Sequence, residues 1–171
     1  MKRAGGGFDA SYNAQAAVDD TTHIIVAAKL TNNAADVGQL VPMLKAVRAN
    51  TGKDPEQALA DAGYRSEKNF EDLADSSTVL VVAMGREGKQ SAVIDTKKNP
   101  HMAAMAAKMQ TDEGRAAYRR RKLIAEPPNG WIKSVLGLKQ FSLRELPRVQ
   151  ATFKLVCLAL NLRRMGEMKA G

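Results

Sequence analysis

The sequence predicts an α/β protein, because strand patterns dominate its first half and helical patterns its second half. Apolar residues alternate with other residues over 12–18 and again over 24–30, as they do in half-buried strands. A β-branched run over 78–83 is typical of a strand that is buried on both faces. From Pro100 onward the apolar spacing is helical. With 171 residues, of which 44% are hydrophobic and 26% charged, the chain can form one domain with a core.

The first two strands should form a hairpin. Four turn-forming residues, from Asp19 to Thr22, separate them at hairpin length, which favours antiparallel pairing. Asn13 and Gln15 share one strand face with Ser11, and we interpret them as polar residues of a half-exposed strand without a function of their own.

Helical spacing then predicts a helix over residues 37–50, in which Pro42 is tolerable only near the first turn. A short strand should end on Asp61. A second helix should follow, with Ser66 as its N-cap and Glu67 in the first turn, where the helix dipole favours an anion. Residues 8–84 are therefore predicted to have the order β-β-α-β-α-β.

The remainder is predicted to comprise a loop over residues 85–99, which is polar and aperiodic, and a basic helical part over residues 100–171. A methionine stripe, formed by Met102, Met105 and Met109, indicates a core or a partner-facing surface rather than a cofactor site.

The next predicted helix can be capped by Thr111 and leads to Glu126, but two prolines interrupt its pattern. Pro127 and Pro128 lack the N–H groups that would bond to the preceding turn. We therefore expect the helix to kink or restart just after Glu126, so that Lys133 can leave its face.

The net charge of +8 is concentrated in the C-terminal part. Residues 1–99 hold 12 Lys and Arg against 13 Asp and Glu, whereas residues 100–171 hold 14 against 5. Such asymmetry indicates a polyanionic partner, and nucleic acid is the commonest one. The run Arg119-Arg120-Arg121-Lys122 favours contact with DNA phosphates over a merely solvated face.

Several other classes of protein are disfavoured. The longest apolar runs, at residues 78–84 and 155–160, are far too short to span a membrane, and the first residues lack the apolar core of a signal peptide. We therefore expect a cytoplasmic protein. Because Cys157 is the only cysteine, the chain has no internal disulfide, and this residue is expected to pack in the core.

One helix face combines a carboxylate with cations and an aromatic ring. Around an ideal helix, five residues fall within about 80° of one another: Arg115, Tyr118, Lys122, Glu126 and Lys133. Basic groups on such a face can hold a phosphate backbone while the carboxylate remains free for a metal ion.

Three blocks together resemble DDE transposases of bacterial insertion sequences. They are the string from Tyr12 to Asp19, the motif Ala60-Asp61-Ala62-Gly63-Tyr64, and the segment from Tyr118 to Lys133 with Glu126-Pro127 and Gly130. The resemblance extends from about residue 7 to residue 162. It implies an RNase H-like mixed sheet flanked by helices.

By position, the resemblance makes Asp61 the second catalytic carboxylate and Glu126 the third, and both become metal ligands. Tyr118 and Lys133 become the outer members of a tyrosine, arginine, glutamate, lysine signature. The chain has Lys122 where that arginine is expected, with Arg121 adjacent, so it would keep the charge but lose bidentate phosphate recognition.

The implied mechanism uses two divalent ions, Mg²⁺ or Mn²⁺, in an in-line displacement at a DNA phosphorus atom. The implied partner is DNA at the transposon ends, together with a second copy of the chain or a full-length transposase. Six residues of the basic helix would contact DNA: Arg115, Tyr118, Arg119, Arg121, Lys122 and Lys133.

The family's first aspartate lies on a strand before the Tyr12 strand. The eleven residues upstream of Tyr12 are Gly-rich and polar, and Asp9 is their sole acid. We therefore expect residues 1–171 to be a single truncated catalytic domain, the C-terminal part of a transposase, which lacks its first strand and is inactive or nearly so alone. In a bacterial cell it would lie in the cytoplasm and join the nucleoid when bound to DNA.

Two other classes stay open. A non-catalytic DNA-binding or interaction remnant could modulate a full-length transposase through the basic helices. An unrelated nuclease of similar fold would need Asp9 or Asp19 in place of the first carboxylate, although Asp19 more naturally belongs to the hairpin turn.

Overall fold

A computed structural model describes residues 11–85, 94–138 and 140–170. Asp9 and residues 86–93 of the predicted loop therefore lie outside the described residues. The chain divides into two compact units, one formed by Met1–Ala34 with Ile124–Gly171 and the other by Ala35–Leu123. Each unit contains a small β-sheet and its own hydrophobic core.

The first unit contains the predicted antiparallel hairpin, formed by β1 (Asn13–Val18) and β2 (Ile25–Thr31). The turn is closed by Asp19, whose Oδ1 accepts hydrogen bonds from Thr22 N at 2.7 Å and Thr22 Oγ1 at 2.5 Å. These hydrogen bonds lower the pKa of the Asp19 carboxyl. The prediction that Asp19 belongs to the turn is confirmed.

The prediction of a half-exposed Gln15 is wrong. Gln15 is 2% exposed, and its Nε2 donates to Asn13 Oδ1 at 2.9 Å, whereas Ala14 and Ala16 are exposed. Alternation along a strand separates two faces but does not say which of them is covered. Because an alanine side chain has little apolar area, its burial contributes too little free energy to determine which face is covered.

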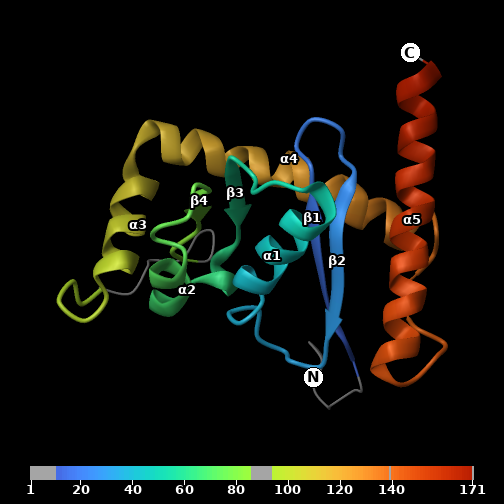
Figure 1. Cartoon of the computed structure of the whole chain (residues 1–171), viewed down its shortest axis with the longest axis horizontal. Coiled ribbons are helices and arrows are strands. Elements are labelled where there is room, and N and C mark those ends of the chain that lie inside the picture. The colour runs from blue at the N-terminus through green and yellow to red at the C-terminus, as the bar shows by residue number, and fades with distance from the viewer. Residues whose placement is uncertain (1–10, 86–93, 139, 171) are drawn as a thin grey trace. The chain divides into compact units, whose positions relative to one another are not determined.

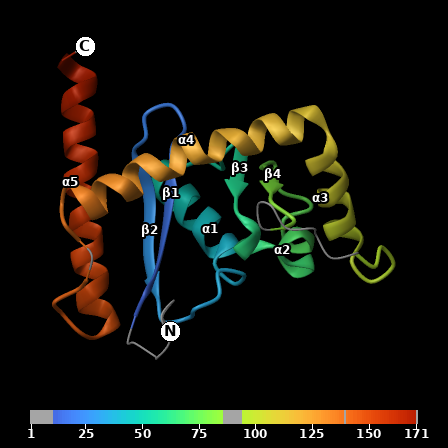
Figure 2. The same ribbon diagram turned by 180° about the vertical axis from the view of Figure 1, so that it is seen from behind.

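Helix α5 (Leu146–Ala170) lies along β2, as Figures 1 and 2 both show. Its Asn161 accepts from Ile25 N at 2.8 Å and donates to Ile25 O at 2.9 Å, and its Gln150 accepts from Leu30 N at 2.6 Å. These side chains occupy backbone groups of β2 that would otherwise form an open sheet edge. Cys157 is buried in the same core, so its predicted packing role is confirmed.

The second unit contains β3 (Gln57–Ala60) and β4 (Val79–Val82), which pair in parallel. Parallel strands need a crossover, which is made here by a 3-10 helix, η1 (Ala62–Tyr64), and by α2 (Glu67–Asp72). Helix α1 (Leu40–Thr51) precedes β3 and has Pro42 in its first turn, as the sequence required.

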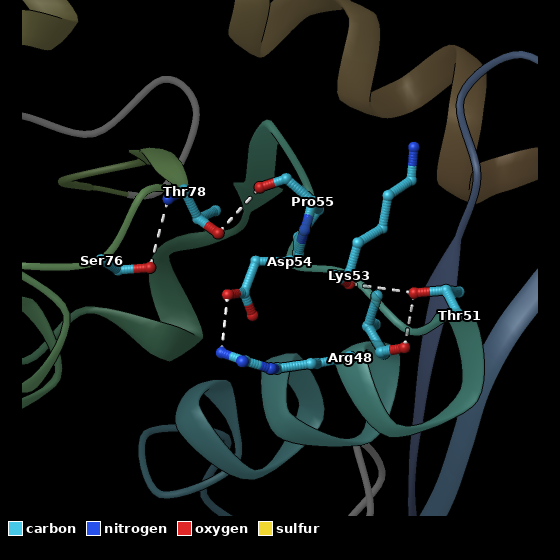
Figure 3. Close-up of polar contacts among 8 residues, drawn as sticks. Arg48, Thr51, Lys53, Asp54, Pro55, Ser76 and Thr78 are labelled. Atoms are coloured by element: carbon cyan, nitrogen blue, oxygen red, sulfur yellow. Dashed lines mark hydrogen bonds and ion pairs between the residues drawn. The ribbon is translucent and has the colours of Figure 1, made fainter.

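The loop from α1 to β3 is held by several polar contacts (Figure 3). Arg48 pairs with Asp54 at 3.0 Å, and Thr51 Oγ1 donates to the carbonyls of Val47 at 2.8 Å and Lys53 at 3.0 Å. Thr78 Oγ1 donates to Pro55 O at 2.8 Å, at the other end of the same loop. These contacts fasten the start of β3 beside the start of β4.

Helix α3 (Pro100–Gln110) buries Met105, and Met102 and Met109 pack against the same core as β4. The methionine stripe is therefore core rather than a cofactor site. At the end of α3, Thr111 Oγ1 accepts from Gly114 N at 3.0 Å, which confirms the predicted cap of the next helix.

That helix, α4 (Asp112–Ser134), continues through Pro127 and Pro128 (Figure 2). Of the two predicted outcomes, a restart after Glu126 is therefore wrong, and a kink there stays a prediction. The prolines remove two backbone hydrogen bonds from a 23-residue helix, while their fixed φ angle is itself helical. Asn129 Nδ2 donates to Ala125 O at 2.9 Å, which adds a side-chain hydrogen bond to the same turn.

The α/β class is confirmed. The strands of the described residues form two sheets of two strands each, one antiparallel and one parallel. In the same part of the chain, no helix combines the length and the apolar character needed to cross a membrane.

Candidate metal-binding and DNA-binding residues

Asp61 directly follows the carboxyl end of β3 and is the N-cap of η1. Its backbone is still extended, and its Oδ1 accepts a hydrogen bond from Gly63 N at 2.9 Å. Ligands of parallel α/β sheets commonly bind at this edge, outside the carboxyl ends of the strands. The local sequence therefore forms a turn that holds a half-buried carboxylate at the edge of a sheet.

A second carboxylate, that of Asp36, lies close to the Asp61 turn. A Cβ atom placed on Gly63 would lie 2.7 Å from Asp36 Oδ2 and 3.0 Å from Asp61 Oδ1. Both carboxylate oxygens therefore pack closely against Gly63, where a larger residue would have to displace one of them. Asp36 belongs to the segment between β2 and α1.

The negative charges of these two carboxylates affect the pKa of the Tyr64 hydroxyl. Burial raises the pKa of Tyr64 well above its usual value, and the negative charges of Asp36 and Asp61 raise it further. The positive charge of Arg121 acts on the same pKa in the opposite direction. One arginine of α4 therefore lies within electrostatic range of the turn that carries Asp61.

Asn69 fastens the two carboxylate-bearing segments to each other. This α2 residue is 6% exposed, and its Nδ2 donates to Val37 O at 2.5 Å and to Tyr64 O at 2.9 Å. Val37 follows Asp36, and Tyr64 ends the 3-10 turn that Asp61 begins. The amide thus fixes the distance between these two segments.

Ser66 and Glu67 differ from expectation in what their side chains do. Ser66 occupies the N-cap position of α2, as predicted, but its side chain makes no capping hydrogen bond. The carboxylate of Glu67 instead accepts from His101 N at 2.9 Å and Met102 N at 2.8 Å. It therefore caps the first turn of α3, where backbone N–H groups lack partners within the helix.

Most of the predicted DNA-binding side chains of α4 are exposed: Arg115, Arg119, Lys122 and Lys133. Arg115 also pairs with Asp112 at 2.9 Å. Tyr118 and Arg121 are half-buried and stack, with the guanidinium carbon 5.5 Å from the ring centroid.

Arg121 carries an unused donor. Its Nε is buried and has no hydrogen-bond partner among the described residues. A buried guanidinium donor that lacks a partner is unfavourable, and an anionic oxygen would satisfy it.

Glu126 is exposed on α4, and in the described part of the chain its carboxylate has neither a hydrogen bond nor an ion pair. It belongs to the first unit, together with Lys133, whereas Asp61 and Arg121 belong to the second. Asp61, Asp36, Tyr64 and Arg121 therefore belong to one compact unit, and Glu126 belongs to the other.

Sequence reasoning missed Asp36 and Asn69. Asp36 lies in an aperiodic stretch, Asn32-Asn33-Ala34-Ala35-Asp36, which contains turn formers and has no apolar spacing. Asn69 directly precedes Phe70, the first apolar residue of α2, so the apolar pattern gave no signal that Asn69 is buried.

A family model of the transposase DDE domain matches residues 2–162. The chain belongs to this family. No curated protein and no solved structure matches the chain. Transposase DDE domains act in transposition on DNA and typically use divalent metal ions.

The carboxylate of Asp61 is of the donor type that suits such an ion, because Mg²⁺ and Mn²⁺ prefer carboxylate oxygens and need few of them from the protein. Among the described residues, no group of three or more His, Cys, Asp or Glu side chains forms a ready-made metal cluster.

Proposed function

We propose that this chain acts in DNA transposition through metal-dependent cleavage and transfer of DNA strands, with an RNase H-like arrangement of its catalytic carboxylates. Asp61 would be the second catalytic carboxylate and Glu126 the third, and both would be ligands of Mg²⁺ or Mn²⁺. The observation that carries the proposal is the place of Asp61 at the carboxyl end of β3, beside a second carboxylate, in a chain of the transposase DDE family.

A bound divalent ion would lower the pKa of an attacking water or 3′-hydroxyl and stabilise the leaving oxygen. The protein's own part is to position the ligands. The Gly63 N–H holds one oxygen of Asp61, and the exposed carboxylate of Glu126 is open to an ion or to DNA.

The basic side chains of α4 would hold the DNA backbone at transposon ends. Arg115, Arg119, Lys122 and Lys133 are exposed cations that can approach phosphates, and Arg121 offers a buried donor stacked on Tyr118. None of these contacts reads a base, so they supply affinity rather than sequence preference.

Nicking of a supercoiled plasmid tests the catalytic proposal. We expect the chain alone to nick DNA only very slowly, in a reaction that requires Mn²⁺ or Mg²⁺ and is lost in Asp61→Asn and in Glu126→Gln, because each change removes a proposed metal ligand. Asp54→Asn is the matched control, since Asp54 pairs with Arg48 away from the Asp61 turn. Nicks that survive both substitutions would contradict the proposal.

The alternative is a non-catalytic DNA-binding chain that modulates a full-length transposase, which the exposed cations of α4 alone would support. It predicts DNA binding that is equal in Mg²⁺ and in EDTA, without nicks. Co-purification with a full-length transposase or with a second copy of the chain would then identify its partner.

A further inference from the structure

We propose that the outer face of α5 binds the same face of a second copy of this chain, as a short pair of packed helices. This face, called the outer seam below, consists of five residues: Ala151, Leu155, Leu158, Leu162 and Met165. The inference goes beyond the proposed catalysis and does not depend on it, because the seam contains none of the residues proposed to bind metal or DNA.

The first argument is the spacing of the outer seam along the helix. Its residues follow one another at intervals of four, three, four and three positions. An apolar repeat with this mean spacing of about 3.5 residues is the pattern by which two helices pack side by side. The seam therefore has the form of a surface that another helix covers.

The second argument is that α5 is apolar on two opposite faces, of which the structure covers one. The residues buried in the core beside β2 are Val149, Phe153, Cys157 and Leu160. Around an ideal helix, the centre of this buried set lies about 165° from the centre of the outer seam. The three seam leucines are 65%, 51% and 59% exposed in chain order. A helix that is apolar on all sides is normally buried on all sides, so the seam calls for a cover.

The third argument is the scarcity of charge beside the outer seam. The positions that flank it are Thr152, Lys154, Ala159, Asn161 and Gly166. Lys154 is the one charged residue in this set, so two copies can meet without a row of opposed like charges. A DNA backbone needs several cations to hold it, which favours a second helix over nucleic acid as the occupant.

The fourth argument is the area that the outer seam offers. Met165 is 49% exposed, similar to the seam leucines, and Ala151 is exposed as well. With on the order of 100 Å² free on each large residue, two copies would bury roughly 800–1,000 Å² in total, which is the range of weak, transient interfaces. We therefore expect a reversible dimer with a dissociation constant in the micromolar range.

Sedimentation velocity of the full chain, without DNA or divalent ions, tests the inference over a range from about 1 to 200 µM. The sedimentation coefficient of the wild type should rise with concentration. Leu158→Lys should weaken association at least tenfold, because it would bury an unpaired charge at the centre of the seam. Leu123→Lys is the matched control, since Leu123 is a 71% exposed leucine of α4, and it should associate like the wild type.

A mixture of two variants tests whether the seam meets its own copy. Leu158 is the middle residue of the seam, so it lies near its counterpart whichever way the two helices run. Leu158→Lys and Leu158→Glu should each be monomeric alone, and an equal mixture should form dimers because opposite charges then face each other. Circular dichroism checks that both variants remain folded.

Three results would overturn the inference: a wild type that stays monomeric, a dimer that Leu158→Lys leaves unchanged, and a mixture of the two charged variants that stays monomeric. If a charged variant does not fold, Leu158→Cys and Leu123→Cys replace it. Because Cys157 is buried, mild oxidation should link two chains of Leu158→Cys and neither the wild type nor Leu123→Cys. Absence of that link would equally overturn the inference.

Discussion

Removal of the Asn69 amide should destabilise the protein more than its size suggests. Asn69→Ala deletes two hydrogen bonds, to Val37 O at 2.5 Å and to Tyr64 O at 2.9 Å, from a residue that is 6% exposed. Each such bond contributes about 0.5–1.5 kcal/mol, and an acceptor left buried without a partner costs about 1–3 kcal/mol. We therefore expect a loss of about 2–4 kcal/mol from a total that is only about 5–15 kcal/mol in typical domains.

Urea unfolding followed by circular dichroism measures this loss. With an m-value of about 1–3 kcal/mol/M, the midpoint should fall by roughly 1–2 M. Lys68→Ala on the same helix is the control, because Lys68 is exposed and its pair with Asp72 is worth only about 0.3–0.5 kcal/mol. A midpoint for Asn69→Ala as close to that of the wild type as the control's would refute the claim that this amide fastens the two segments.

Three further predictions concern stability. Asn161→Ala exposes the Ile25 backbone groups that it now satisfies and should cost about 1–3 kcal/mol in urea unfolding; an unchanged midpoint would mean that water replaces it freely. Gly114→Ala should lower the melting temperature by several degrees, because the added Cβ would collide with the Lys108 carbonyl. A melting temperature equal to that of the wild type would contradict this close contact between the start of α4 and the end of α3. Burial raises the pKa of Cys157 from 9.0 to about 11, so its contribution to stability is complete below pH 9 and is lost as the pH rises through 11. A thiol reagent at pH 8 should accordingly label Cys157 only in urea, and rapid labelling of the folded chain would disprove its burial.

The secondary structure was largely predictable because it follows from local chemistry. The hairpin turn at Asp19, the early position of Pro42 and the cap at Thr111 are all visible in neighbouring residues, and all three agree with the structure. The position of Asp61 at a strand end followed in the same way from the short apolar stretch before the glycine turn.

What could not be predicted depends on contacts between distant residues. Gln15 is buried although its strand pattern gave no preference between the two faces. Helix α4 continues through its two prolines because the other residues of the helix retain their hydrogen bonds. A rule that considers only the bonds lost at the prolines leaves those retained bonds out. Asp36 approaches Asp61 only through the fold of the chain between them, and no motif in its own segment marks it.

Iron-directed backbone cleavage would test the central claim, that the carboxylate turn at Asp61 holds a divalent cation, most directly. Fe²⁺ takes the place of Mg²⁺ at many oxygen sites and generates hydroxyl radicals that cut the nearby chain. The full chain, treated with Fe²⁺, ascorbate and peroxide, should be cut beside Asp61, and excess Mg²⁺ should suppress this cut. Cleavage confined to other segments, or cuts that Mg²⁺ does not suppress, would contradict the assignment of the metal to this turn.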